Sequence, residues 1–303
     1  MIKITDYSKV FEILVDKTAQ YVTTNNLKAM ILGISGGIDS TVVAAICHEV
    51  SKRTNIPLIG RSLPTKFNKE GETTTADLVG KAFCTDYKVF NMDLSYRKFS
   101  YDITFSEGLI DTSGPFDFDK KLPKQTNLAN GNIQARLRMI YLYNLASVYG
   151  GLVMDTDNLT ENNLGYFTIH GDVGDFNPIG GLWKTEVFEL AKYLTSYYKN
   201  ISCVHSNTEL ILENLNKSKA IAESIKLIPT AGLGITNNDL EEIGAESYDQ
   251  VDRVLQCLTD NSISTDTIDD IPDIVLESIV KRHNASKFKR KQLPIKIDRV
   301  WLQ

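Results

Sequence analysis

The sequence of 303 residues lacks the features of several large protein classes. It has only four cysteines, and none of them stands in a CxxC pair. This spacing excludes a zinc knuckle or a disulfide framework and predicts reduced thiols. No apolar run approaches the roughly 18 residues that span a bilayer, and acidic side chains interrupt the N-terminal stretch where a signal peptide would be apolar. We therefore expect a cytoplasmic protein with no membrane partner.

Positive charge is also scarce. The chain has 33 lysines and arginines against 38 aspartates and glutamates, which gives a formal net charge of −5. Domains that bind nucleic acid are usually basic, so the composition argues against a nucleic-acid partner. The four histidines are His48, His170, His205 and His283. They show no catalytic-triad or metal-ligand spacing, and we expect them to be structural.

Short, almost wholly apolar segments alternate with amphipathic ones. The predicted strands are residues 28–34, 57–63, 88–94 and 151–155, and the clearest predicted helices are residues 7–24, 41–50, 73–83 and 132–149. Such short apolar runs are typical of parallel strands that are buried on both faces. The alternation predicts an α/β fold, a doubly wound and mostly parallel sheet with helices on both faces.

Two segments depart from the regular alternation. We expect residues 1–303 to form a single domain, within which the polar segment at about 195–227 reads as a helical insertion. The tail, residues 281–303, is strongly basic. Residues 95–125 have weak periodicity and read as a helix followed by a loop.

The most informative segment is ILGISGGIDSTVVAA, which runs from a predicted strand into a predicted helix. Gly36 and Gly37 let the backbone turn sharply, so that N–H groups converge at the helix N-terminus and stabilise an anion there. Ser35 and Ser40 add hydroxyl donors, and Asp39 offers a hard oxygen ligand for Mg²⁺. The segment matches neither GxxxxGK[ST] nor GxGxxG.

The pattern SGGxDS after a buried strand resembles the PP-loop of N-type ATP pyrophosphatases, which holds the pyrophosphate that leaves when AMP is transferred. Further matching segments are NIQARLRM at 132–139, the run from DTDNLTE to GLWKTE at 155–186, IPTAG at 228–232, ESYDQVDRVL at 246–255 and KRHNASKFKRK at 281–291. Together they are similar to ammonia-dependent NAD synthetase over nearly the entire chain. The resemblance implies an adenine nucleotide alpha hydrolase-like fold and an ATP-dependent ligase. This enzyme would convert deamido-NAD and ammonia into NAD, AMP and pyrophosphate through an acyl-adenylate.

The resemblance also implies roles for individual residues. Asp39 and Lys184 would be catalytic, and Asp39 and Glu161 would bind Mg²⁺. The residues expected to contact ATP are Gly33, Ser35, Gly36, Gly37, Asp39, Ser40, Thr156, Lys184 and Thr230. Those expected to contact deamido-NAD are Tyr21, Arg136, Asp175 and Lys289. The resemblance further implies a homodimer and, since no glutaminase segment precedes the loop, free ammonia or an ammonia-supplying partner.

The chain departs from the family pattern at three positions. Ile169 stands where the family often has a lysine, Phe288 replaces the histidine of HKR, and Ser62 shifts Arg61 by one place. Two of these positions contact the dinucleotide in the family, so the departures concern the identity of the substrate that is expected to be deamido-NAD. One alternative is another PP-loop enzyme, which would adenylate a different carboxylate or an RNA base. A second alternative is a nucleotide-binding homologue without turnover.

Overall fold

A parallel β-sheet forms the centre of the protein. The computed structural model describes residues 4–106, 124–204, 206–227, 239–260, 263–292 and 294–299. Four strands lie in the order β3-β2-β1-β4, and every pairing between them is parallel. Their bounds are Met30–Gly33 (β1), Leu58–Ser62 (β2), Asp86–Val89 (β3) and Leu152–Val153 (β4). The prediction of a parallel sheet is confirmed.

The direction in which the sheet grows reverses at β1. The chain adds β2 and β3 on one side of β1 and then returns to place β4 on the other side. In open α/β sheets, ligands bind in the crevice at such a reversal, outside the carboxyl ends of the strands. Because the Gly-rich loop follows β1 directly, the fold places it at this crevice.

Helices cover both faces of the sheet. Successive side chains of a strand point to opposite faces, so Met30 and Leu32 belong to one hydrophobic core and Ala29 and Ile31 to another. The first core includes side chains from α1 (Tyr7–Thr24), α2 (Ile38–Thr54), α3 (Glu70–Phe83), α7 (Lys184–Val204) and α8 (Thr208–Lys226). The second core is closed by α5 (Lys124–Tyr149). This arrangement confirms the doubly wound fold.

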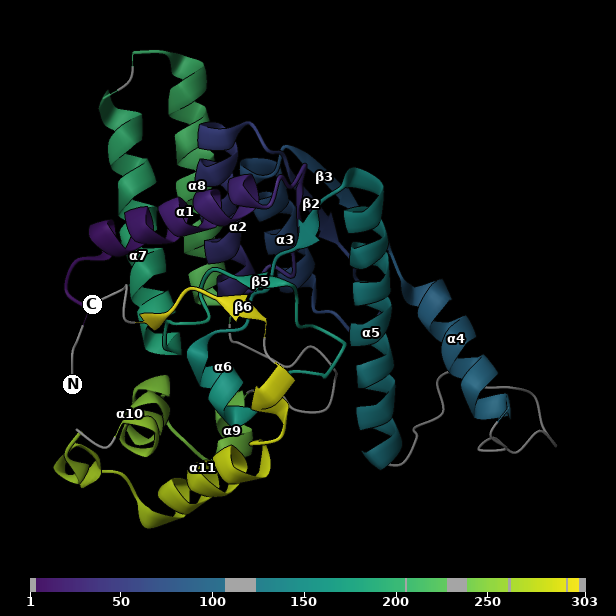
Figure 1. Ribbon diagram of the computed structural model, residues 1–303, viewed down its shortest axis with the longest axis vertical. Coiled ribbons are helices and arrows are strands. Elements are labelled where there is room, and N and C mark those ends of the chain that lie inside the picture. Colours follow the sequence, from purple (N-terminus) through teal and green to yellow (C-terminus); the bar gives the residue numbers. More distant parts are fainter. Residues whose placement is uncertain are drawn as a thin grey trace.

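A third, smaller core lies outside the sheet. It joins α6 (Leu159–Leu164), α9 (Asp239–Ile243), α10 (Tyr248–Thr259) and α11 (Asp273–Ala285), which gather in the lower part of Figure 1. Two short strands, β5 (Phe176–Asn177) and β6 (Ile295–Lys296), pair in parallel, and Met154 bridges to Phe176. Two 3-10 turns, η1 (Thr265–Ile268) and η2 (Lys289–Gln292), flank α11.

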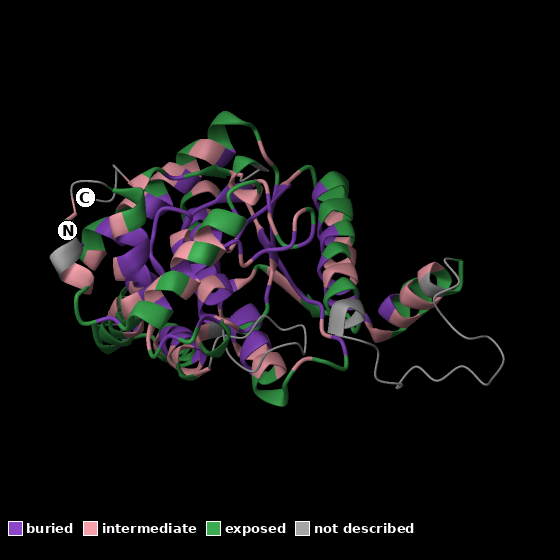
Figure 2. Cartoon of the chain, turned by 90° about the horizontal axis from the view of Figure 1, so that it is seen from below, coloured by how far each residue is buried: buried purple, intermediate pink, exposed green. Residues whose placement is uncertain are grey.

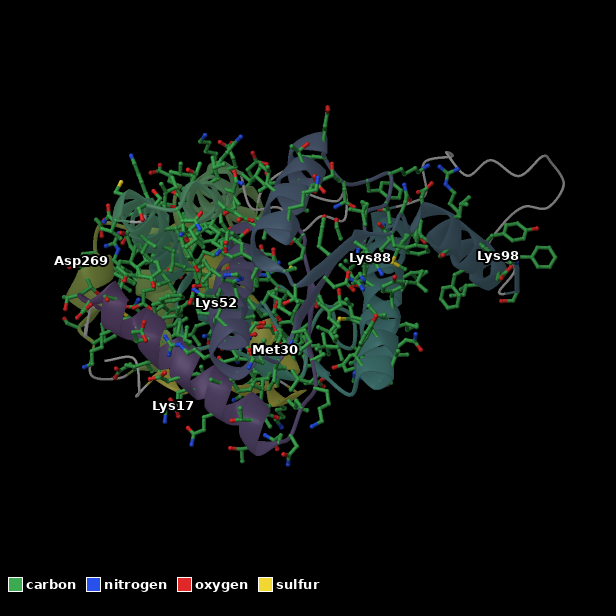
Figure 3. The ribbon with its side chains drawn as sticks, turned by 90° about the horizontal axis from the view of Figure 1, so that it is seen from above. Lys17, Met30, Lys52, Lys88, Lys98 and Asp269 are labelled. Atoms are coloured by element: carbon green, nitrogen blue, oxygen red, sulfur yellow. The ribbon has the colours of Figure 1, made fainter. Side chains whose placement is uncertain are left out.

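Burial follows this layering. Buried residues fill the centre of the chain, whereas α4 (Asp93–Ser106) stands out beside α5 with mostly exposed and half-buried positions (Figure 2). Met30 on β1 has no exposed surface, and its side chain lies within the body of the molecule. Lys17, Lys98 and Asp269 lie at its edge (Figure 3).

The strand predicted at residues 88–94 is wrong in its second half. The observed strand ends at Val89, and α4 begins at Asp93. The side chain of Asn91 accepts a hydrogen bond from the Asp93 backbone N–H at 2.9 Å. Asparagine favours such a local turn over a sheet ladder, because its side chain satisfies a backbone donor. The turn therefore starts a helix where the apolar pattern alone favoured a strand.

The polar segment at 195–227 is helical, as expected, and consists of the end of α7 and the whole of α8, which pack against each other. All four cysteines are free: Cys47 is buried, Cys203 is exposed, and Cys84 and Cys257 are partly buried. Within the described ranges, no helix combines the length and the apolar character that a membrane crossing needs.

Candidate active site

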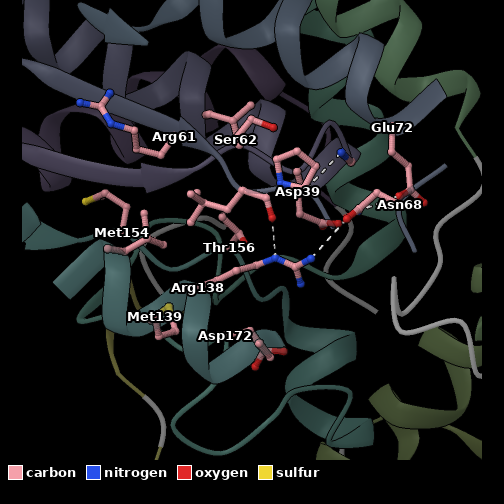
Figure 4. Close-up of a pocket in the computed structure, with 18 of the residues that line it drawn as sticks. Asp39, Arg61, Ser62, Asn68, Glu72, Arg138, Met139, Met154, Thr156 and Asp172 are labelled. Carbon is pink, nitrogen blue, oxygen red and sulfur yellow. Dashed lines mark hydrogen bonds between the residues drawn. The ribbon is translucent and has the colours of Figure 1, made fainter. Parts of the chain in front are cut away.

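A cavity of about 310 Å³ opens at the carboxyl edge of the sheet, at the reversal point beside β1. Its lining includes residues that follow three of the strands and residues of α2, α5, α6 and α7 (Figure 4). The predicted site residues in this lining are Gly33, Ser35, Gly37, Asp39, Thr156, Glu161 and Lys184. The structure thus brings most of the predicted ATP and metal residues into one cavity.

The Gly-rich loop is built around Gly36, which has a φ of 87°. A Cβ atom at this position would lie 2.3 Å from the Glu72 carbonyl oxygen, so only glycine fits. Ser35 Oγ accepts from the Gly37 N–H at 3.2 Å and lies 2.9 Å from Ser40 Oγ. Ser40 is buried, whereas Ser35 is exposed. Gly36 and Ser40 therefore shape the loop, and Ser35 and Gly37 face the cavity.

Lys184 is the central cation of the site. Its Nζ lies 2.5 Å from Asp39 Oδ2 and 2.9 Å from Glu161 Oε1, and its side chain is only 1% exposed. Burial alone would lower the pKa of Lys184, but the two carboxylates outweigh burial and raise this pKa well above its ordinary value. Burial, together with the neighbouring Asp39, raises the pKa of Glu161 to about 7.

Local sequence explains these positions. Asp39 lies in the first turn of α2, and Glu161 lies in the first turn of α6, where Asn158 is the N-cap. Acidic residues are stabilised at helix N-termini by the orphan N–H groups and the helix dipole. Lys184 is the first residue of α7, and its backbone N–H donates to Thr160 Oγ1 at 2.8 Å.

Sequence reasoning missed Asp252 on α10, which links α6 to α7. This carboxylate is 2% exposed and accepts hydrogen bonds from Thr160 Oγ1, from the Thr185 N–H at 2.9 Å and from Thr185 Oγ1 at 2.8 Å. Burial raises the pKa of Asp252 to about 6, against the effect of these donors. The matched ESYDQVDRVL motif was the signal that could have pointed to it.

Arg138 was also missed, because only Arg136 of the same motif was assigned to a substrate. The Arg138 side chain reaches from α5 to the segment after β2, where Nε donates to the Leu63 carbonyl at 2.9 Å and Nη2 to Asn68 Oδ1 at 3.3 Å (Figure 4). Burial lowers its pKa. This guanidinium holds one wall of the cavity in place.

Asp172 lines the cavity and lies near three cationic side chains. It accepts from the Thr168 N–H at 2.7 Å, and burial raises its pKa to about 7 while Lys289, Arg138 and Arg136 oppose that rise. Arg136 is exposed, and its Nε donates to the Ile169 carbonyl at 3.3 Å. Arg136 and Lys289, two predicted substrate contacts, therefore lie on the same side of the site.

The basic tail binds the protein itself. At the C-terminal end of α6 and just after it, the carbonyls of Asn163, Leu164, Gly165 and Phe167 accept hydrogen bonds from the tail. Arg290 Nη1 donates to the Asn163 carbonyl at 2.8 Å, Arg282 Nε to the Leu164 carbonyl at 3.2 Å, and Lys289 Nζ to the Gly165 carbonyl at 2.8 Å. Cations complement the negative end of a helix dipole. The tail therefore fixes the helix that carries Glu161.

Tyr21 and Asp175 both lie outside the lining of the main cavity. Tyr21 stacks on Phe176 with ring centroids 4.3 Å apart, and the two rings line an open hollow between α1 and β6. Asp175 precedes Phe176 and accepts from Tyr143 Oη and from the Val153 N–H, both at 3.0 Å. Thr230, the remaining predicted ATP contact, lies outside the described residues.

The donor set fits a magnesium ion that is shared with phosphates. Oxygens of Asp39 and Glu161 converge on one point, within 2.9 Å of a single nitrogen. Magnesium in nucleotide enzymes commonly takes one or two carboxylates and completes its shell with phosphate oxygens and water. In the part of the chain that the structure describes, no group of three or more His, Cys, Asp and Glu residues could hold a metal. The described residues of the site therefore do not offer an all-protein metal cage.

Two further carboxylates lie buried behind the cavity. Asp155 and Asp157 are 1% and 7% exposed, and the Oδ2 atom of each has no hydrogen-bond partner. Asp155 Oδ1 accepts from the Asp157 N–H at 2.7 Å. Burial raises the pKa of Asp155 to about 7 and that of Asp157 well above its ordinary value. Burial thus favours the protonated, neutral form of both side chains.

Comparison with known proteins places these features in one family. The sequence model described as NAD synthase matches residues 10–293. The NH(3)-dependent NAD(+) synthetase of Thermoplasma acidophilum is 34% identical over 265 residues, which cover 87% of this chain and 88% of that protein. The protein of the same name from Campylobacter jejuni is 30% identical over 257 residues, which cover 84% of this chain and 85% of that protein.

Solved structures agree with the fold. A structure described as an NMN synthetase from Francisella tularensis superposes with a TM-score of 0.70 at 25% identity, covering 94% of this chain and 96% of that chain. The NH3-dependent NAD synthetase of Campylobacter jejuni superposes with a TM-score of 0.64 at 23% identity, covering 97% and 100%. The family match spans the loop, the two carboxylates and the lysine of the site, and the chain belongs to the NAD synthase family.

Proposed function

We propose that the protein uses ATP to join ammonia to the carboxylate of deamido-NAD, giving NAD, AMP and pyrophosphate. The observation that carries this proposal is the meeting of Lys184, Asp39 and Glu161 beside a Gly-rich loop of PP-loop type. The relatives named NH(3)-dependent NAD(+) synthetase support the same reaction. The alternative of a PP-loop enzyme that acts on RNA is not favoured.

The reaction has two steps. The substrate carboxylate oxygen attacks the α-phosphorus of ATP, and pyrophosphate leaves. Ammonia then attacks the acyl carbon. The bond between this carbon and the phosphate oxygen of AMP breaks, and AMP leaves with the bonding electron pair. The former ammonia nitrogen loses a proton to give the amide. Charge on the phosphate oxygens needs nearby cations, and Lys184 is the buried cation of the cavity. The N–H groups after Ser35, at the start of α2, would bind the released pyrophosphate.

We propose that Asp39 and Glu161 hold Mg²⁺ together with the ATP phosphates. Bound Mg²⁺ would neutralise phosphate charge and keep the α-phosphorus open to attack. Lys184 would then turn from the carboxylates to a phosphate oxygen. The convergence of the two carboxylate oxygens on Lys184 Nζ supports this assignment. Thr156 after β4 and Thr230 remain our candidates for further ATP contacts.

Two regions are our candidates for the dinucleotide site. Arg136 and Lys289 lie on the Asp172 side of the cavity and could meet the pyrophosphate or the carboxylate of the substrate. Tyr21 offers an aromatic face beside Phe176, and Asp175, the residue before Phe176, contacts Tyr143 of α5. This division matches a long substrate with a charged end and a flat aromatic end.

We also propose a homodimer in the cytoplasm. Large apolar side chains lie exposed on the outer face of α5 and on α4: Leu94, Phe99, Leu128, Ile140 and Val148 are between 44% and 82% exposed. An apolar patch of this kind is a feature of surfaces that bind a protein, and a second copy of this chain is the occupant that we propose. Ammonia would come from solution or from an ammonia-supplying partner.

A second candidate substrate is the deamidated mononucleotide. The solved structure described as an NMN synthetase supports it, and so does Ile169, since the family often has a lysine at this position. A mononucleotide carries one phosphate in place of a pyrophosphate and needs fewer cations. We favour the dinucleotide, because the curated relatives at 30% identity or more are named NAD synthetases.

One assay tests the proposed reaction and the choice between the two substrates. Purified protein is incubated with ATP, MgCl₂ and NH₄Cl and with either deamido-NAD or its mononucleotide, and the products are separated by chromatography. We expect NAD, AMP and pyrophosphate in equal amounts. ADP as the product would refute the PP-loop mechanism. A higher kcat/KM for the mononucleotide would replace the dinucleotide as the substrate and leave the mechanism standing.

A further inference from the structure

Asn158 contacts both carboxylates of the candidate metal site. Its Nδ2 donates to Asp39 Oδ1 at 2.9 Å, and its backbone N–H donates to Glu161 Oε2 at 3.1 Å. Its own Oδ1 accepts from the Glu161 backbone N–H at 3.0 Å. The side chain has no exposed surface. One buried asparagine thus joins two acids that lie far apart in the sequence.

Asn158 and Lys184 divide the four carboxylate oxygens between them. Lys184 contacts Oδ2 of Asp39 and Oε1 of Glu161. Asn158 contacts the other oxygen of each acid, Oδ1 of Asp39 and Oε2 of Glu161. Each carboxylate is therefore held from both sides, so that the two contacts fix its position and its orientation.

This division matters when phosphates arrive. In the proposed mechanism, Lys184 turns to a phosphate oxygen and frees Oδ2 of Asp39 and Oε1 of Glu161 for the metal. The contacts with Asn158 involve the opposite oxygens and need not break. Through these two hydrogen bonds, Asn158 still ties the two carboxylates to each other.

We propose that Asn158 is a positioning residue that sets the separation and orientation of the two magnesium-binding carboxylates. This inference rests on the proposed metal site and adds to it a residue that does not touch the ion. The amide group suits the task, because its oxygen caps α6 while its nitrogen reaches α2. A hydroxyl or a carboxylate can make the first contact but cannot make both.

The simpler interpretation is that Asn158 only caps α6. A substitution distinguishes this capping role from the proposed positioning role. Asn158→Ser keeps a good N-cap oxygen, but its side chain is too short to reach Asp39. A matched control is Asn207→Ser, since Asn207 is the N-cap of α8, accepts from the Glu209 N–H at 2.8 Å and is exposed. If Asn158 only caps its helix, the two substitutions should have similar effects on Mn²⁺ binding.

The experiment measures binding of Mn²⁺ in the presence of inorganic pyrophosphate, by electron paramagnetic resonance of the free ion, together with the Tm of each variant. We expect Asn158→Ser to weaken Mn²⁺ binding about tenfold, the effect of losing a hydrogen bond to a charged group. We expect Asn207→Ser to leave the binding unchanged. Wild-type affinity in Asn158→Ser would overturn the inference.

A second variant covers the case in which the serine protein does not fold. Asn158→Asp keeps the cap and turns the contact with Asp39 into a repulsion, so Mn²⁺ should bind more weakly than to the wild type. An affinity equal to the wild type or higher would overturn the inference. If the wild type itself fails to bind Mn²⁺ with pyrophosphate, the metal site of the proposed function is wrong, which is a distinct result.

Discussion

The Lys184 ammonium lies 2.5 Å from the Asp39 carboxylate, although 145 residues separate the two in the sequence. The fold creates this contact by placing the start of α7 against the start of α2. The contact compensates the charge of a carboxylate beside the Gly-rich loop. It also puts a cation where the proposed metal and phosphates would meet, so its removal is the most direct test of the site.

Lys184→Met should lower turnover about 10²- to 10³-fold, because the transition state loses a preorganised charge. It should also lower the free energy of unfolding by about 3–5 kcal/mol, the effect of leaving buried charges uncompensated. Steady-state assays and urea unfolding measure the two quantities. Lys192→Met is the control on the same helix, since Lys192 pairs with Glu189 at the surface. Equal activities in the two variants would contradict the role of Lys184.

Asp39→Ala and Glu161→Ala should each abolish turnover while the fold remains intact. Without either carboxylate, the phosphate-bound metal loses one of its protein ligands. The release of pyrophosphate reports turnover, and far-ultraviolet circular dichroism reports the fold. Glu189→Ala, on the exposed side of α7, should retain full activity. A variant of Asp39 or Glu161 with wild-type rates would remove that residue from the site.

Arg138→Met should raise the KM for ATP about tenfold, because the segment from Leu63 to Asn68 loses two hydrogen bonds to a charged group. Arg136→Met should instead raise the KM for deamido-NAD, since Arg136 lies outside the lining of the main cavity. Varying each substrate in turn separates the two effects. If both variants change the two KM values in the same way, Arg138 and Arg136 do not act on different substrates.

Lys289→Ala should raise the KM for deamido-NAD more than the KM for ATP, by roughly ten- to a hundredfold if the contact is charge-assisted. Lys289 now donates to the carbonyls of Gly165 and Phe167, so the substitution should also lower the Tm. Lys287→Ala, at an exposed position of the same tail, is the control. A lower Tm with both KM values unchanged would leave Lys289 a purely structural role.

Asp155→Asn should flatten the pH dependence of stability. The folded protein keeps the Asp155 proton up to a pKa of about 7, because the group is buried, whereas the unfolded chain releases it near pH 4. The unfolded state therefore binds fewer protons in this window, and stability falls as pH rises from 4 to 7. Over this pH window, the free energy of unfolding should fall by about 1–3 kcal/mol less in the variant than in the wild type. Urea unfolding at pH 5 and pH 7.5 measures it, and an equally steep decline would contradict the assignment.

The parts of the site that the sequence predicts are those that lie next to each other in the chain. Ser35, Gly37 and Asp39 follow one strand, so their position at the edge of a parallel sheet could be inferred from the sequence. The parallel sheet and the helices on both faces followed from the apolar runs in the same way. The prediction of a strand at residues 88–94 was wrong at Asn91, because one side-chain hydrogen bond outweighed the apolar pattern.

The rest of the site depends on contacts across the fold, which a single sequence does not show. Asp252 and Asn158 look like ordinary polar residues until α6, α7 and α10 come together around them. Arg138 could not be separated from Arg136, since both lie in the same motif and only helix orientation decides which one enters the cavity. Whether Tyr21 and Asp175 bind the dinucleotide stays a prediction.

The anchoring of α6 by the basic tail has a consequence for how the enzyme is made. The Asn163 carbonyl and the Arg290 guanidinium are 127 residues apart, and translation delivers them in that order. A nascent chain already contains the Gly-rich loop, Glu161 and Lys184 while α6 still lacks the groups that bind its C-terminal end. Catalytic competence therefore requires residues that the ribosome adds long after the Gly-rich loop, Glu161 and Lys184.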